Sequence, residues 1–281
     1  MKRVLVLTVL VWLSSPIAEA FEALPKPPSP SPLMPAPVPV HSPVPSVPAL
    51  PDRSAPKLWK DGESAGKKPP TIKLGEKQES DKPTYRGAGY ITAGATKVKA
   101  DGNKLTALLT TAAFSHSFWG ASSVSVASLQ LVQEFEIVPG SPKDKMVVVS
   151  LSGKLDGYVR SEKKGTAGLR LADASIAPVG GGPMVWFSLP SSRVSATSLE
   201  RCERSAKPVQ VAVKPGRYVL VGRLVLETTV DGCIRSHAEA VFDPGNHFLG
   251  TWSSEDSPRP EVEGKDFGLA ITIKVATSPS D

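Results

Sequence analysis

Hydrophobic and polar side chains alternate along much of the chain, and this period of two is the feature that most constrains the fold. Alternation puts one side of a strand on a core and the other in water, which is typical of antiparallel, half-buried sheet. No stretch keeps the spacing of an amphipathic helix over a convincing length. The alternating positions are Val147, Val149, Leu151 and Leu155; Val185, Phe187 and Leu189; Val209, Val211 and Val213; Tyr218, Leu220, Leu224 and Leu226; and Phe267, Leu269, Ile271, Ile273 and Val275.

Turn-forming residues such as Asp101-Gly102-Asn103 separate further strand-like segments. Within one of them, residues 124–138, the apolar positions change phase between Val126 and Leu129, which predicts a bulge or a strand crossing. About nine short strands with such punctuation predict an all-β fold, a single antiparallel two-sheet β-sandwich that is immunoglobulin-like or jelly-roll-like. The other strand-like segments are residues 90–98, 105–115, 167–174 and 234–242.

Residues 209–220 contain a strand, the turn Pro215-Gly216 and a second strand that begins near Tyr218. This arrangement resembles the strand, Pro-Gly turn and tyrosine strand of bacterial secreted immunoglobulin-like or transthyretin-like sandwiches. The resemblance covers about a dozen residues. It implies a sandwich fold and carries no catalytic positions.

The first twenty residues have the three parts of a secretory signal peptide. Lys2 and Arg3 give a basic start, residues 4–13 an apolar run, and Ala18-Glu19-Ala20 a small-x-small end, so we expect cleavage before Phe21. The run is too short to cross a hydrocarbon core about 30 Å thick; an uncleaved anchor is the alternative. We therefore expect export to the periplasm, cell surface or extracellular space, without stable transmembrane insertion.

Two segments without strand patterning follow. Residues 21–56 are rich in proline, which lacks the backbone donor of sheets and helices, so they predict an extended spacer. Residues 57–84 are lysine-rich and poor in large apolar side chains, which predicts a disordered linker. The sandwich domain is expected to span residues 85–281.

The net charge of +6 bears on the choice of partners. It allows a weak, salt-sensitive attraction to acidic polysaccharides or phospholipid surfaces. The lysines are dispersed among Glu63, Glu76, Glu79 and Asp81, however, so solubility is the simpler interpretation. We expect a glycan, an envelope polymer or another surface protein as partner, and no nucleic acid.

Cys202 and Cys233 are the two cysteines of the chain. An even number of cysteines in an exported protein predicts a disulfide between them. Closing a loop of about 30 residues stabilises a fold by about 3 to 4 kcal/mol in the chain-entropy description. Two free thiols are the alternative.

One strand carries a group of polar side chains. Cys233, Arg235, His237 and Glu239 alternate with Ile234, Ala238, Ala240 and Phe242, so the polar set is predicted to face solvent. A carboxylate beside an imidazole can orient its tautomer or raise its pKa. Arg235, His237 and Glu239 are therefore candidate ligand-binding residues, although a solvated strand face has the same pattern.

Tryptophans give a second candidate site. Trp119 and Trp252 lie in turn regions, where exposed indoles can stack on sugars or anchor a protein partner. Capping of the sandwich core is the alternative role. Trp186 alternates with Val185 and Phe187, which puts it on the less buried face of its strand or under a loop, and its role is open.

Catalytic motifs are absent: no G-x-S-x-G elbow, metal-ligand spacing, phosphate loop or assignable acid pair occurs. We therefore expect no catalytic residues, metal or cofactor. The leading hypothesis is a non-enzymatic binding or adhesion module on a proline-rich stalk. The alternatives are a structural subunit of an extracellular assembly and a glycan-directed hydrolase on a jelly-roll.

Overall fold

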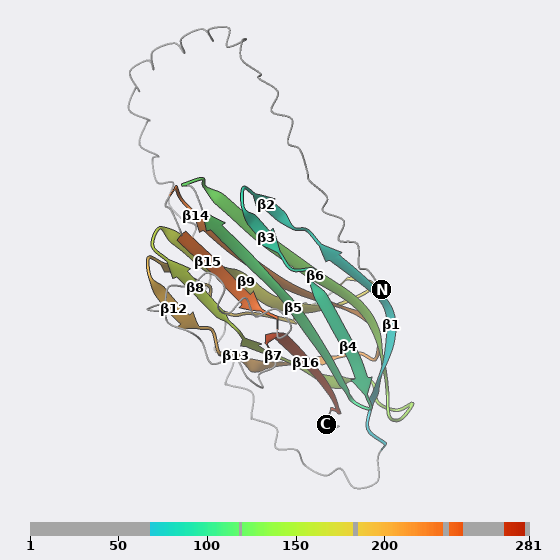
Figure 1. Ribbon diagram of the computed structural model, residues 1–281. Helices are drawn as coiled ribbons and strands as arrows, with labels where there is room; N and C mark the ends of the chain where they lie inside the picture. The colour runs from blue at the N-terminus through green and yellow to red at the C-terminus, as the bar shows by residue number, and fades with distance from the viewer. Residues whose placement is uncertain (1–67, 118–119, 182–184, 233–235, 244–266, 279–281) are drawn as a thin grey trace, which may run out of the picture. The chain divides into compact units, whose positions relative to one another are not determined.

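The computed structural model describes residues 68–117, 120–181, 185–232, 236–243 and 267–278. Strands dominate these residues and form two antiparallel sheets that pack face to face (Figure 1). The two-sheet β-sandwich predicted from the alternation is confirmed. The predicted signal peptide and proline-rich spacer lie outside the described residues.

The three longest strands of the first sheet, β6 (Ser123–Val138), β14 (Gly216–Val230) and β9 (Gly165–Pro178), lie at its centre. Its order is β1 (Thr71–Asp81), β6, β14, β9 and β10 (Val185–Ser188). β2 (Thr84–Arg86) pairs with β6, and β11 (Ser192–Ser195) pairs with β9.

The second sheet is built around β5. Its order is β12 (Ser198–Arg201), β8 (Tyr158–Glu162), β15 (Ser236–Phe242), β5 (Lys104–Ser117), β16 (Gly268–Thr277), β7 (Val147–Asp156) and β13 (Arg204–Val213). β3 (Gly89–Ile91) and β4 (Ala95–Asp101) also pair with β5. The turn at Pro215-Gly216 joins β13 in this sheet to β14 in the other, and the hydroxyl of Tyr218 donates to the Lys214 carbonyl at 2.5 Å.

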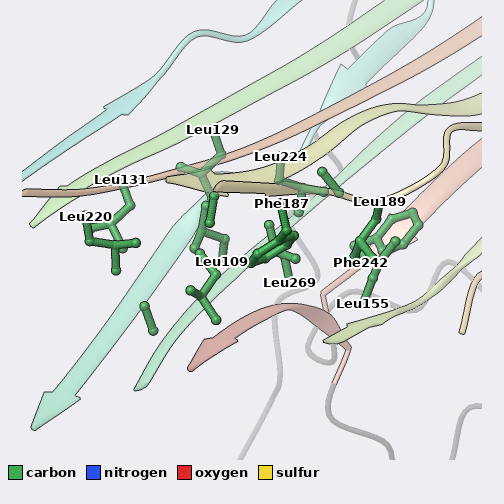
Figure 2. Packing of buried hydrophobic residues seen from close by; sticks show 14 of the residues in the cluster. Leu109, Leu129, Leu131, Leu155, Phe187, Leu189, Leu220, Leu224, Phe242 and Leu269 are labelled. Atoms are coloured by element: carbon green, nitrogen blue, oxygen red, sulfur yellow. The ribbon is translucent and has the colours of Figure 1, made fainter. Parts of the chain in front are cut away.

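The core lies between the sheets, where the inward-facing side chains of both meet (Figure 2). Leu109 and Leu269 of the second sheet and Leu220 and Leu224 of the first are fully buried. Phe187 lies over Gly153, where a Cβ would overlap its ring. The alternating hydrophobic positions are therefore what binds the two sheets together.

β6 is regular throughout, so the predicted bulge or crossing between Val126 and Leu129 is wrong. Its pairing with β14 has no register shift from Ser123 to Ile137. Ser123 and Ser125 occupy inward positions that apolar side chains take elsewhere on the strand, and both are buried. Ser125 is accommodated because its hydroxyl donates to the Phe114 carbonyl at 2.6 Å. Val124 and Val126 face outward, which produced the apparent change of phase.

β1 lies inside the segment 57–84 that was predicted as a disordered linker, and β2 begins at its last residue, so that prediction is wrong for residues 71–81 and for residue 84. β1 pairs antiparallel with β6 from Thr71 to Asp81, with a register shift between Leu74 and Lys77. Most of its side chains are exposed. An edge strand of this kind is held mainly by backbone hydrogen bonds, so its composition does not reveal it.

Candidate functional site

The strand that carries His237 and Glu239 is buried on both faces, so the prediction that these two side chains meet solvent is wrong. Every side chain of β15 is buried; His237 is 6% exposed and Glu239 is fully buried. The reason is the neighbouring strand β8, which places Glu162 opposite His237 and Arg160 opposite Glu239. Opposite charges on adjacent strands pair one another, and this lowers the cost of removing them from water.

Arg160 links the two carboxylates of this buried quartet, which consists of Arg160, Glu162, His237 and Glu239. Its Nη2 donates to Glu162 Oε1 at 2.5 Å, and its Nη1 donates to Glu239 Oε1 at 3.4 Å. The other oxygen of Glu239, Oε2, lies 3.0 Å from His237 Nε2. Both glutamates therefore have a nitrogen partner inside the fold.

Aromatic rings surround the quartet on the same face of the sheet. Tyr90 stacks on Phe114 with ring centroids 4.6 Å apart, and Tyr158 meets Phe267 edge to face at 6.0 Å. Burial and the negative charge of Glu239 raise the pKa of Tyr158 and of Tyr90 well above the usual value. Both phenols are therefore neutral at physiological pH.

Two further interactions involve residues next to the quartet and its aromatic neighbours. Burial, followed by the charge of His237, lowers the pKa of His116, which lies opposite His237 on β5. The guanidinium of Arg201 lies 4.6 Å from the ring centroid of Phe267 and pairs with Asp156. Charged and aromatic groups thus lie together in one region of the second sheet.

The arrangement of the quartet does not resemble that of a hydrolytic acid pair. A glycosidase separates two carboxyl groups across a cleft that admits sugar and water. Glu162 and Glu239 instead share Arg160, are at most 4% exposed, and line neither of the two surface grooves described below. This geometry favours a role in holding β8 against β15.

The remaining candidates from the sequence are only partly placed. Trp119, Trp252, Arg235 and Cys233 lie outside the described residues. Cys202 is buried, it forms no disulfide within the described part of the chain, and burial raises the pKa of its thiol. The disulfide to Cys233 stays a prediction, which thiol labelling of the denatured, unreduced protein tests directly.

Trp186 is the one tryptophan in the described part of the chain, and it lies on the outer face of the first sheet. It is 58% exposed, whereas Val185 and Phe187 on either side of it are buried. Across the sheet Trp186 lies opposite Ser175 of β9, which in turn lies opposite Val221 of β14. Small and medium-sized side chains therefore lie beside the indole, and much of its ring is open to solvent.

The next row of outward-facing residues across these strands contains a hydrogen-bonded polar pair, Asp173 and Arg223. Ser188 lies opposite Asp173, and Asp173 lies opposite Arg223. The guanidinium of Arg223 donates from Nε to Asp173 Oδ1 at 2.9 Å and from Nη2 to Oδ2 at 2.5 Å. This bidentate hydrogen bonding raises the pKa of Arg223 and fixes the two side chains relative to each other.

A polar groove of about 240 Å³ continues the same outer face along β9. Arg193 and Glu227 lie on either side of Gly168, whose missing side chain keeps the floor low. Glu227 is held by Arg170, with 2.7 Å between Oε2 and Nε. We call the surface from Trp186 through Asp173 and Arg223 to this groove the tryptophan face.

Sequence reasoning left Trp186 without a role and missed Arg223 and Asp173. These two residues are 50 positions apart in the chain, and the register of β9 with β14 brings them together. No local pattern marks either as part of a site. What brings them together is the pairing of the strands, which a single sequence does not show.

No family model, curated protein or solved structure matches this chain. The described residues include no helix long and apolar enough to span a membrane. Among the same residues, no group of three or more histidine, cysteine, aspartate or glutamate side chains is placed to hold a metal ion.

Proposed function

We propose that this protein is an exported, non-enzymatic binding module that holds an extended, neutral glycan on the tryptophan face. The observation that carries the proposal is an exposed indole, Trp186, in the row next to the fixed Arg223 and Asp173 pair. The face of an indole stacks on the apolar C–H face of a sugar ring. A preorganised guanidinium and carboxylate offer donors and acceptors to its hydroxyl groups at low entropic cost.

The shape of the surface favours an extended ligand. Outward-facing residues of β9 run from Ser175 beside Trp186 to Thr166 in the polar groove. At about 3.3 Å per residue, this path is about 30 Å long. A linear chain of several sugar units matches such a path better than a single small molecule does.

The buried quartet supports a binding role over a hydrolytic one, because Arg160 engages both buried glutamates. Two of the sheet edges weigh against a structural subunit that assembles by strand addition. The edge strands β1 and β13 each contain a register shift, and β13 carries Pro208, which cannot donate a backbone hydrogen bond. Both devices hinder edge-to-edge pairing.

The test uses the full-length protein on an array of neutral oligosaccharides that includes cellohexaose and chitohexaose, followed by calorimetric titration with the ligands that bind. We expect Trp186→Ala to weaken binding by at least about tenfold, which is about 1.4 kcal/mol. Tyr85→Ala removes another exposed aromatic ring, 63% exposed on β2, and is the matched control. Its affinity should equal that of the wild type.

Two results would overturn the proposal. One is a folded protein that binds none of the neutral oligosaccharides at millimolar concentration. The other is binding that Trp186→Ala leaves unchanged, which would place the ligand on another surface.

A further inference from the structure

The outer face of the second sheet carries a trough of about 640 Å³ with a floor of small side chains and lysines around it. One row across the strands reads Lys97, Leu108, Ala270 and Lys154, from β4 through β5 and β16 to β7. The two lysines are three strand spacings apart, about 14 Å. They form opposite walls, and Leu108 and Ala270 form the floor between them.

The next row of outward-facing residues, two positions further along each strand, has a similar arrangement. Lys99 lies opposite Thr106, Thr106 opposite Thr272, and Thr272 opposite Ser152. The wall formed by β4 is therefore cationic twice in succession, and the floor now offers hydroxyl groups. We call these two rows the lysine trough.

A third row adds an independent indication of an anionic ligand. Lys104 of β5 and Lys274 of β16 are direct cross-strand neighbours, and both are exposed. Like charges directly opposite each other destabilise a sheet. Asp101 lies on the other side of Lys104 and offsets part of this repulsion, and a bound anion would relieve the rest.

Acidic side chains do not neutralise this face. Within the described part of the chain, Lys154 alone of the five lysines makes an ion pair, at 3.4 Å from Glu203, and both partners are more than half exposed. Asp156, at one end of the trough, pairs with Arg201. Asp101 and Glu203 thus oppose five lysines, which leaves an excess of positive charge.

We propose that the lysine trough is a second binding site, for a linear acidic polysaccharide. Lysines on two walls attract the acidic groups of such a chain, and the threonine and serine hydroxyls of the floor match its sugar hydroxyls. The residues that line the trough include no aromatic ring, so it lacks the stacking platforms with which proteins hold single-stranded nucleic acids.

This site is distinct from the tryptophan face, because the two occupy the outer faces of different sheets. A chain of neutral sugar on one face and an acidic chain on the other would make the protein a bridge between two polymers. Neither site depends on the other, so each can fail separately.

The test measures binding of the full-length protein to polygalacturonate at several salt concentrations. Methyl-esterified polygalacturonate of the same length is the neutral comparison, heparin replaces carboxylates by sulfates, and a single-stranded DNA is the nucleic acid comparison. We expect binding to polygalacturonate or to heparin that weakens steeply with salt. The ester should bind at least about tenfold more weakly than the acid.

The key variant is the double substitution Lys97→Gln and Lys99→Gln. Its matched control is Lys143→Gln with Lys145→Gln, which removes the same charge from an exposed turn. We expect the trough variant to lose about tenfold or more in affinity and the control about twofold or less. Trp186→Ala should bind polygalacturonate like the wild type, which separates this site from the proposed neutral glycan site.

The proposal is overturned if both double variants lose affinity equally, because that result indicates attraction by net charge alone. It is also overturned if the methyl ester binds as tightly as the acid. Tighter binding of the DNA, with the same dependence on Lys97 and Lys99, would assign the trough to nucleic acid instead.

Discussion

Arg160 of β8 and Glu239 of β15 lie opposite each other in the second sheet and pair at 3.4 Å although both side chains are buried. Glu162 shares the same guanidinium at 2.5 Å. Removing one partner of a buried ion pair leaves the other charged and without compensation, which is more costly than losing a surface pair. The stability of this part of the sandwich should therefore depend strongly on Arg160.

The first prediction concerns Arg160→Met, which keeps most of the volume of the side chain and removes its charge. We expect it to lower the free energy of unfolding by about 3 to 5 kcal/mol. Arg217→Met removes a surface partner of Glu134 and should cost less than about 1 kcal/mol. Denaturant unfolding of the two variants checks this, and equal losses would contradict a structural role for the quartet.

The second prediction concerns acid sensitivity. Burial and His237 lower the pKa of His116 in the folded protein. Its unfolded pKa is about 6.5, so the unfolded state takes up the proton first as the pH falls. The stability that neutral His116 contributes is thus present above about pH 6.5 and is lost as the pH falls through the lower, folded value.

His116→Gln should therefore flatten the decline in stability between neutral and mildly acidic pH. Melting temperatures of wild type and variant across this range provide the measurement. An unchanged pH dependence in the variant would show that another group controls acid unfolding.

The third prediction concerns alkaline pH. The pKa of Tyr158 is raised by burial and by Glu239, so its phenol stays neutral in the folded state. The unfolded phenol ionises near pH 10, so the stability contributed by Tyr158 is present below that pH and is lost as the pH rises above it. Tyr158→Phe should be less sensitive to alkaline unfolding. Phenolate absorbance followed beside circular dichroism checks whether ionisation and unfolding coincide, and full ionisation of every tyrosine in the folded protein would refute the prediction.

The fourth prediction concerns the edge of the first sheet. Deleting residues 1–82 removes β1, which pairs with β6 from Thr71 to Asp81, whereas deleting residues 1–67 leaves this strand intact. The longer deletion should be less stable, because it leaves one edge of β6 unpaired from Leu129 to Val138 and removes the buried side chain of Ile72 from the core. Thermal melts of both deletions give the answer. Equal melting temperatures would mean that β1 contributes nothing to the stability of the sandwich.

Particular strands show how far the sequence alone could predict this fold. β7, β14 and β16 place apolar side chains at most of their inward positions, and their alternation predicts both strand and inward face. β1 lacks this signal because its backbone, more than its side chains, holds it in place. β6 gave a misleading signal because Ser123 and Ser125 occupy inward positions.

The candidate sites were harder to predict because each depends on residues far apart in the chain. Glu239 and Arg160 are separated by 79 positions, so the polar face of β15 read as solvated when its partner was unknown. The lysine trough combines four strands whose order the sequence does not state. The alternation put Trp186 on the less buried face of its strand or under a loop, and it did not indicate which residues lie beside the indole.

The most direct test of the central proposal is a nuclear magnetic resonance titration of the full-length, isotope-labelled protein with cellohexaose and with chitohexaose. If the tryptophan face binds a neutral glycan, the indole N–H signal of Trp186 and the amide signals of Asp173, Ser175 and Arg223 shift together and saturate with one affinity. If those signals stay in place, or shifts with either sugar gather on another surface, the tryptophan face is not the binding site for these neutral glycans.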